Sequence, residues 1–232
     1  EIASCLVGSE MCIRDSASVL VGDFLHTRSF QMMVEAGSMR IMEILSAATN
    51  VIAEGEVLQL MNMHDASLDE AGYLRVIRSK TAKLFEASAR LGAILANSPP
   101  DVEEACATYG QALGTAFQII DDVLDYDGDT AEMGKNLGDD LREGKSTLPL
   151  IAAMERGTPS QAEIVRQAIE QGSTERLEEV VSIVRSTGAL DVTRAAAFAE
   201  AHRAMAAARL LPANAYSEGL LELAAQLLGR RN

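Results

Sequence analysis

The stretch FQIIDDVLDYDGD, Phe117–Asp129, joins an apolar run to a dense group of carboxylates. Its apolar residues recur at helical spacing, so this stretch is predicted to be the end of a helix. Asp121 and Asp125 are four residues apart and therefore share one face of that helix. Asp122 lies one position round, and Gln118 lies one turn before Asp122 on an adjoining face. The stretch thus predicts an acidic cluster at the end of a long helix.

Carboxylates this close together repel one another, and a cation stabilises them. Oxygen ligands without His or Cys suit a hard ion such as Mg²⁺, which takes one or two carboxylates together with phosphate oxygens of a substrate. Asp121, Asp122 and Asp125 are therefore predicted to be metal ligands in a Mg²⁺–diphosphate site. The segment alone leaves a second interpretation open, an acidic helix end that is simply solvated.

Two other kinds of metal site do not fit the sequence. Asp125, Asp127 and Asp129 alternate as in a calcium-binding EF-hand loop, but Thr130 stands where that loop needs Gly and Asn136 where it needs Glu. A carboxylate-bridged di-iron bundle needs Glu three residues before His on two helices. None of the three histidines meets this requirement: His26, His64 and His202.

A Gly-rich segment with two lysines follows the acidic cluster. Lys135 and Lys145 are flexible point donors suited to the remaining oxygens of a metal-bound diphosphate, and the glycines let the backbone approach closely. The GKST sequence at 144–147 is not a P-loop, because Asp139 stands where the first Gly is required and no strand precedes it. From spacing alone, both lysines are equally well explained as ordinary surface residues.

A second basic segment lies within a predicted helix that includes Tyr73 through Leu95. Lys80 and Thr81 add an ammonium and a hydroxyl group to the same phosphate site if this helix faces the acidic one. Ser67 and Glu70 have the spacing of a capping box and are predicted to open the helix. An exposed amphipathic face is the alternative for Lys80 and Thr81.

Composition and periodicity predict an all-α protein. Of 232 residues 48% are hydrophobic and 4% aromatic, and no strand-like alternation competes with the helical pattern. Further helices are predicted from Ala17 to Ala36, from Met39 to about Asn62, and from Pro100 to about Tyr126. Another is expected between a capping box at Thr158 and Gln161 and a stop at Gly172.

Charge and cysteine content limit the class of protein. A formal charge of −14 argues against a nucleic-acid surface, which needs Lys and Arg to replace counterions. Three cysteines are too few for a disulfide framework and predict a reducing, cytoplasmic location. The longest stretch without charge, Ala105–Ile120, is too short to span a bilayer, so no transmembrane helix is expected. A secretory signal is not expected either.

FQIIDDVLDYDGD followed by GKNLGDDLREGKSTLPLI resembles the second aspartate-rich motif and its loop in the trans-prenyl diphosphate synthases. Three further stretches resemble the same family: ASVLVGDFLHTRSFQMM, NVIAEGEVLQLMN and YLRVIRSKTAKLFEAS. The resemblance is greatest to the long-chain, octaprenyl type of bacteria and extends from Ala17 to Asn232. Motifs of this length and order are more specific than an isolated DDxxD.

The resemblance implies an isoprenoid synthase type bundle of long antiparallel helices around a central cavity, in a homodimer. It implies an enzyme that condenses isopentenyl diphosphate onto an allylic donor such as farnesyl diphosphate, with Mg²⁺, for quinone side chains. Asp121, Asp122, Lys80 and Gln118 then form the catalytic set. Diphosphate-binding roles are implied for Lys80, Thr81, Gln118, Lys135 and Lys145, and metal-binding roles for Asp121, Asp122 and Asp125.

The family's first aspartate-rich motif and its isopentenyl-diphosphate anchor do not occur in this sequence. Residues 1–16 show no amphipathic face and are expected to be foreign to the family, with 17–232 forming the C-terminal two thirds of its domain. The chain is therefore expected to be inactive by itself. Alternatives that stay open are a synthase of another product length, such as geranylgeranyl diphosphate, a non-catalytic subunit of a heteromeric synthase, and a helical interaction scaffold.

Overall fold

A computed structural model describes residues 10–127 and 137–229, in which the regular secondary structure is helical and no strand occurs. The all-α prediction is therefore confirmed. The helices are α2 (Glu10–Glu35), α3 (Met39–Met61), α4 (Glu70–Ile77), a π-helical turn η1 (Arg78–Ala82), α5 (Lys83–Leu95), α6 (Pro100–Asp127), α8 (Asp139–Arg142), α9 (Leu148–Arg156), α10 (Pro159–Gln171), α11 (Leu177–Ser186), α12 (Ala189–Ala208) and α13 (Ala215–Gly229).

The chain divides into two compact units, residues 1–46 and 47–232. The first contains α2 and the beginning of α3, separated at Gly37, whose φ of 65° suits a residue without a Cβ. Helix α2 begins at Glu10, seven residues before the predicted start at Ala17. The sequence before Ala17 has no amphipathic pattern and therefore predicts no helix there, but the helix extends back to Glu10 all the same.

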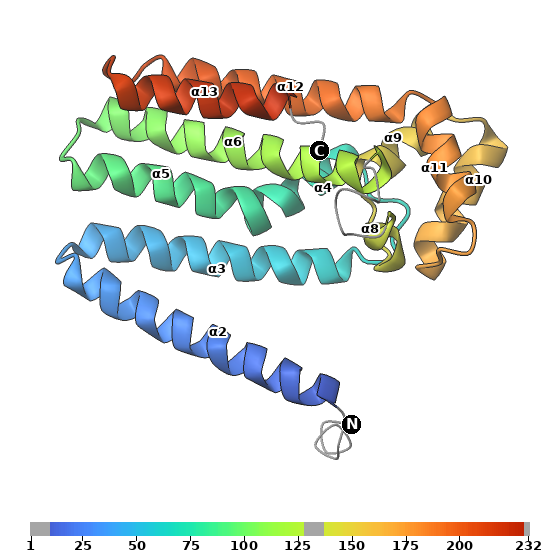
Figure 1. Cartoon of the computed structure of the whole chain (residues 1–232), viewed down its shortest axis with the longest axis horizontal. Helices are drawn as coiled ribbons and strands as arrows, with labels where there is room; N and C mark the ends of the chain where they lie inside the picture. Colours follow the sequence, from blue (N-terminus) through green and yellow to red (C-terminus); the bar gives the residue numbers. More distant parts are fainter. Residues whose placement is uncertain (1–9, 128–136, 230–232) are drawn as a thin grey trace. The chain divides into compact units, whose positions relative to one another are not determined.

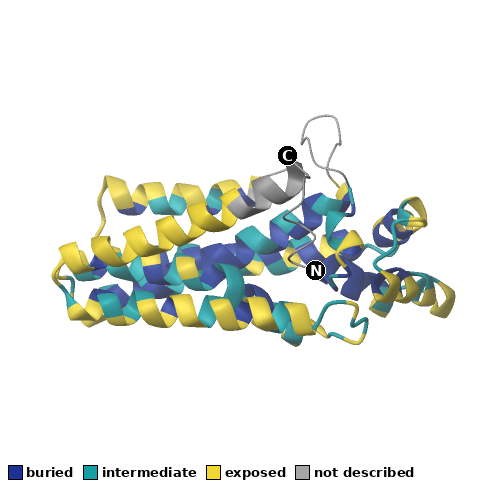
Figure 2. Cartoon of the chain, turned by 90° about the horizontal axis from the view of Figure 1, so that it is seen from below, coloured by how far each residue is buried: buried dark blue, intermediate teal, exposed yellow. Residues whose placement is uncertain are grey.

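The second unit is built around four long helices, α5, α6, α12 and α13 (Figure 1). Consecutive members of this group run in opposite directions. Helix α6 packs against both α5 and α12. Their shared core is rich in alanine, including Ala112, Ala116, Ala201 and Ala204. Small side chains let helix axes approach closely, and the buried faces form the dark band in Figure 2.

A second core cluster forms where the end of α6 meets the shorter helices α9, α10 and α11. Leu150, Ile169 and Val180 are fully buried there. Helix α10 begins and ends as predicted: Thr158 and Gln161 form a complete capping box, and Gly172 ends the helix with φ 57°. Helix α6 also matches its prediction to within one residue.

The region from Ser67 to Leu95 differs from the prediction in two ways. Asp69, and not Ser67, caps α4, because the Asp69 carboxylate accepts from the backbone N–H of Gly72. Ser67 is engaged elsewhere, since its N–H and its hydroxyl both donate to Asp65. The predicted continuous helix is also interrupted by the π-helical turn η1, which inserts one residue between α4 and α5.

Candidate functional site

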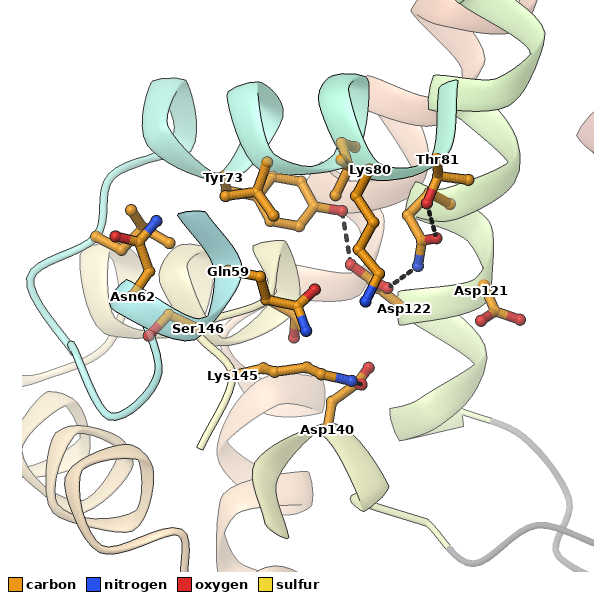
Figure 3. Close-up of a pocket in the computed structure, with 15 residues that line it drawn as sticks. Gln59, Asn62, Tyr73, Lys80, Thr81, Asp121, Asp122, Asp140, Lys145 and Ser146 are labelled. Carbon is orange, nitrogen blue, oxygen red and sulfur yellow. Dashed lines mark hydrogen bonds and ion pairs between the residues drawn. The ribbon is translucent and has the colours of Figure 1, made fainter. Parts of the chain in front are cut away.

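A cavity of about 320 Å³ opens between α4, η1, α6 and the segment after α8 (Figure 3). Apolar side chains from α4 and the preceding loop form part of its wall, and charged and amide groups form the rest. Its lining residues are Gln59, Asn62, Leu68, Tyr73, Val76, Ile77, Lys80, Thr81, Gln118, Asp121, Asp122, Asp140, Lys145, Ser146 and Thr147.

Six of the eight predicted site residues line this cavity, namely Lys80, Thr81, Gln118, Asp121, Asp122 and Lys145. They come from η1, α6 and the segment before α9, so residues as many as 65 positions apart meet in one place. Asp125 is not part of the lining, and Lys135 lies outside the described residues. The functional roles of all eight stay predictions.

A chain of hydrogen bonds fixes the polar wall of the cavity. The Tyr73 hydroxyl donates to Oδ2 of Asp122 at 2.6 Å, and Nε2 of Gln118 donates to Oδ1 of the same carboxylate at 2.9 Å. The Thr81 hydroxyl donates to Oε1 of Gln118 at 3.0 Å. The Gln118 amide therefore accepts from Thr81 through its oxygen and donates to Asp122 through its nitrogen, and these two bonds together determine its orientation.

Asp122 is a carboxylate in an environment that disfavours its charge. Burial, followed by the nearby negative charge of Asp140, raises the pKa of Asp122 to about 8, although the hydrogen bonds from Tyr73 and Gln118 act in the opposite direction. Burial and the adjacent Asp122 likewise raise the pKa of Tyr73. A cation bound beside Asp122 would oppose these effects and favour its charged form.

Asp125 lies one turn further along α6, and its carboxylate binds backbone groups instead of lining the cavity. Its two carboxylate oxygens accept from the backbone N–H groups of Asp139 and Asp140, both at 3.2 Å. Burial, then the charge of Asp140, raises the pKa of Asp125 to about 6. Asp125 thus holds the start of α8, which carries Asp140 into the cavity wall.

The two lysines of the cavity are paired with carboxylates. Nζ of Lys80 lies 2.9 Å from Glu56 on α3. Nζ of Lys145 lies 2.9 Å from Asp140 and 2.7 Å from Glu143. Partial burial disfavours the charge of Lys145, but these two carboxylates outweigh that effect and raise its pKa. Both ammonium groups are therefore held by carboxylates.

The segment that carries Lys145 is attached to the end of α3. The His64 N–H donates to the carbonyl of Gly144 at 2.7 Å, and the Ser146 hydroxyl donates to the carbonyl of Asp65 at 2.7 Å. Gly144 has φ 71°, and a Cβ there would overlap the His64 imidazole. Glycine is therefore required at 144 both by backbone conformation and by space.

The donor set of the cavity suits Mg²⁺, and the ligand roles of Asp121, Asp122 and Asp125 stay predictions. In the part of the chain that the structure describes, no three His, Cys, Asp or Glu side chains converge on one metal position. Asp121 and Asp122 nevertheless face the cavity, and Mg²⁺ needs only one or two carboxylates when phosphate oxygens supply the others. Asp121 and Asp122 are thus the residues that would hold the ion.

Several lining residues were not predicted from the sequence. Tyr73 was noted only as the start of a helix, and Gln59 and Asn62 only as part of another. Asp140 lies in the Gly-rich segment after the acidic cluster, and its sequence context predicts no role for it. A polar or aromatic residue at a helix end gives no signal of its own, and these positions meet the acidic cluster only through tertiary packing.

Comparison with known proteins gives consistent matches. The profile of the family "Polyprenyl synthetase" matches residues 10–185. Octaprenyl diphosphate synthase of Escherichia coli K12 is 54% identical over 211 residues, which are 90% of this chain and 65% of that protein. The corresponding enzyme of Haemophilus influenzae is 49% identical over 211 residues, 90% of this chain and 64% of its own length.

The solved structures give the same result. A polyprenyl synthase from Caulobacter crescentus CB15, complexed with calcium and isoprenyl diphosphate, superposes with a TM-score of 0.88 at 48% identity. The match covers 94% of this chain and 67% of that one. The chain therefore spans about two thirds of the length of the relatives that it matches.

Among the helices that the structure describes, none combines the length and the apolar character that a membrane span requires.

Proposed function

Because the chain belongs to the polyprenyl synthetase family, we propose that its cavity binds the diphosphate of an allylic donor and that the whole protein is a prenyl diphosphate synthase. The reaction is the condensation of isopentenyl diphosphate onto farnesyl diphosphate, repeated until octaprenyl diphosphate is formed. The choice of octaprenyl follows the names of the relatives that are 54% and 49% identical. Use of the product as a quinone side chain is part of the same proposal.

The observation that carries this proposal is the composition of one cavity wall. Its lining includes carboxylate, ammonium, hydroxyl and amide groups, among them those of Asp121, Asp122, Lys80, Lys145, Thr81 and Gln118. A diphosphate bound through Mg²⁺ needs carboxylates for the ion and cationic donors for the remaining oxygens. A helical scaffold without a small-molecule site needs neither, which makes that alternative the weaker one.

In the proposed reaction the carbon–oxygen bond of the allylic donor breaks and diphosphate leaves with the bonding electrons. The double bond of isopentenyl diphosphate attacks the allylic cation, a carbon–carbon bond forms, and the released diphosphate takes up the proton that is lost. Lys80 and Lys145 stabilise the charge that develops on the leaving diphosphate. Bound Mg²⁺ supplies Lewis-acid stabilisation of the same group.

Other residues of the lining suit the hydrocarbon and the cation. Leu68, Val76 and Ile77 present apolar surface that excludes water, which would otherwise capture the cation. The amide of Gln118 is fixed by Thr81 and Asp122, so its dipole does not reorient when positive charge develops. Preorganisation of this kind is expected of a site that ionises its substrate.

The test is incorporation of labelled isopentenyl diphosphate with farnesyl diphosphate and Mg²⁺, followed by chromatographic sizing of the product. The chain is assayed alone and joined to the remaining third of a relative. A C40 product from the joined protein supports both the activity and the octaprenyl length. A shorter product, such as geranylgeranyl diphosphate, rejects the length, and a joined protein without activity favours a non-catalytic subunit.

A homodimer and a cytoplasmic location are also proposed, since the family resemblance and the three cysteines predict them.

A further inference from the structure

The π-helical turn η1 carries both Lys80 and Thr81. It packs closely against glycines of two neighbouring helices. On α3, a Cβ added at Gly55 would lie 2.7 Å from the backbone N of Lys80 and 2.9 Å from Cβ of Ser79. On α6, a Cβ at Gly114 would lie 2.8 Å from Cα of Ala82. The turn is therefore in backbone contact on two sides.

The contact at Gly55 differs from that at Gly114 because of what it touches. Gly114 meets Ala82 and Phe85, which belong to the packed interior of the bundle. Gly55 meets the peptide group of Lys80 itself, and the side chains of Lys80 and Thr81 line the cavity. A displacement at this point therefore moves cavity-lining groups directly.

We propose that Gly55 is a positioning residue for diphosphate binding: the absence of a side chain at 55 sets the position of η1, and with it the Lys80 ammonium and the Thr81 hydroxyl. The inference rests on the proposed function of the cavity. This role of α3 is separate from that of its cavity-lining residues, since Gly55 is not part of the lining.

The physical reason is that the overlap cannot be relieved by a side chain. Contacts below 3.0 Å require some atom to move, and here the opposing atoms are the Lys80 backbone N and the first carbon of the Ser79 side chain, neither of which rotates away. Helix α3 and η1 must therefore separate. Thr81 then moves relative to Gln118, to which it is hydrogen bonded at 3.0 Å.

The test compares Gly55→Ala with two other glycine-to-alanine variants of the same chain. Gly92→Ala, on α5, adds a methyl group with no atom within 4 Å. Gly110→Ala, on α6, overlaps the backbone of Phe85 and so disturbs helix packing away from the cavity lining. Binding of inorganic diphosphate in the presence of Mg²⁺ is measured by calorimetry, and the thermal midpoint is measured for each protein.

We expect Gly55→Ala to weaken diphosphate binding about tenfold or more, and Gly92→Ala to leave it unchanged. Gly110→Ala is expected to lower the thermal midpoint while the folded protein binds diphosphate normally. Equal binding by Gly55→Ala and the unsubstituted chain, or equal loss in Gly55→Ala and Gly110→Ala, overturns the positioning role. If the unsubstituted chain binds no diphosphate, the proposed function of the cavity fails, and this inference fails with it.

Discussion

The hydroxyl of Tyr73 on α4 lies 2.6 Å from Oδ2 of Asp122 on α6, and both residues are at most 3% exposed. This bond joins two helices that both contribute to the lining of the cavity. It also gives a buried carboxylate one of its two side-chain donors, the other being Gln118. The orientation of Asp122 toward a bound cation therefore depends on a residue that carries no charge.

Substitution of Tyr73 by Phe is expected to weaken Mg²⁺-dependent binding of farnesyl diphosphate about tenfold. The hydroxyl lowers the pKa of Asp122, so its removal favours the protonated form, which does not bind a cation. Calorimetric titration at neutral pH measures the change. Tyr109→Phe is the matched control, because that hydroxyl donates to the carbonyl of Leu220 in the bundle core. Equal weakening in both variants would contradict the role of the Tyr73 bond.

Replacement of Asp122 by Asn is expected to change how stability depends on pH. With a pKa of about 8 in the folded chain against an ordinary 3.8, Asp122 keeps a proton that the unfolded chain releases. The free energy of unfolding then falls as pH rises from about 4 to about 8, by at most about 1.4 kcal/mol per pH unit from this group. Asn removes this slope.

The measurement is urea unfolding without Mg²⁺ at pH 5 and pH 9. The stability of Asp122→Asn relative to the unsubstituted chain should increase between these two values. Asp191→Asn, which changes a carboxylate that is 88% exposed, should leave the pH dependence as it was. Parallel pH profiles for Asp122→Asn and the unsubstituted chain would show that burial does not hold the proton on Asp122.

Glu56→Gln is expected to tighten diphosphate binding by about two- to fivefold. Glu56 pairs with Lys80 at 2.9 Å, and a diphosphate must take over that ammonium group. The pair is partly exposed, which limits its strength to about 0.2–1 kcal/mol. Binding of inorganic diphosphate at two salt concentrations measures the effect. Glu86→Gln, which breaks the Lys83 pair outside the cavity, should not change binding, and weaker binding by Glu56→Gln would reject the competition.

Gly144→Ala is expected to destabilise the chain by about 1–2 kcal/mol from backbone conformation alone, because φ is 71° there. Overlap with the His64 imidazole adds to this cost and displaces Lys145. Urea unfolding and diphosphate binding are both measured. In the double variant with His64→Ala, binding should recover in part while the conformational cost remains. No recovery would mean that the imidazole is not what displaces the loop.

The sequence was sufficient for features whose determinants are close together along the chain. Thr158, Gln161 and Gly172 define the ends of α10 by local hydrogen bonds and one backbone conformation, and these were predicted correctly. The start of α4 was predicted wrongly because Ser67 and Asp69 are both competent caps. The turn around Asp65 engages Ser67, which leaves Asp69 to cap the helix.

Features that depend on distant contacts were not predicted. The π-helical turn inserts one residue into an otherwise continuous helical pattern, and a pattern of apolar residues does not reveal a single insertion. Tyr73 and Asp122 are 49 residues apart, so their hydrogen bond exists only in the folded chain. The acidic motif could be found in the sequence, whereas the groups that orient it could not.

The extra residue in η1 also sets the rotation of everything that follows it. Each residue of an α-helix turns the chain by about 100°, so an insertion in a helix changes which side of its second half meets a neighbour. With the insertion present, Phe85 lies against Gly110 and Gly114. Deleting one residue from 78–82 would leave a regular helix but direct the bulky face of α5 away from its groove. The same residue that widens the helix beside the cavity thus keeps both α4 and α5 in phase with α6, which contacts both of them.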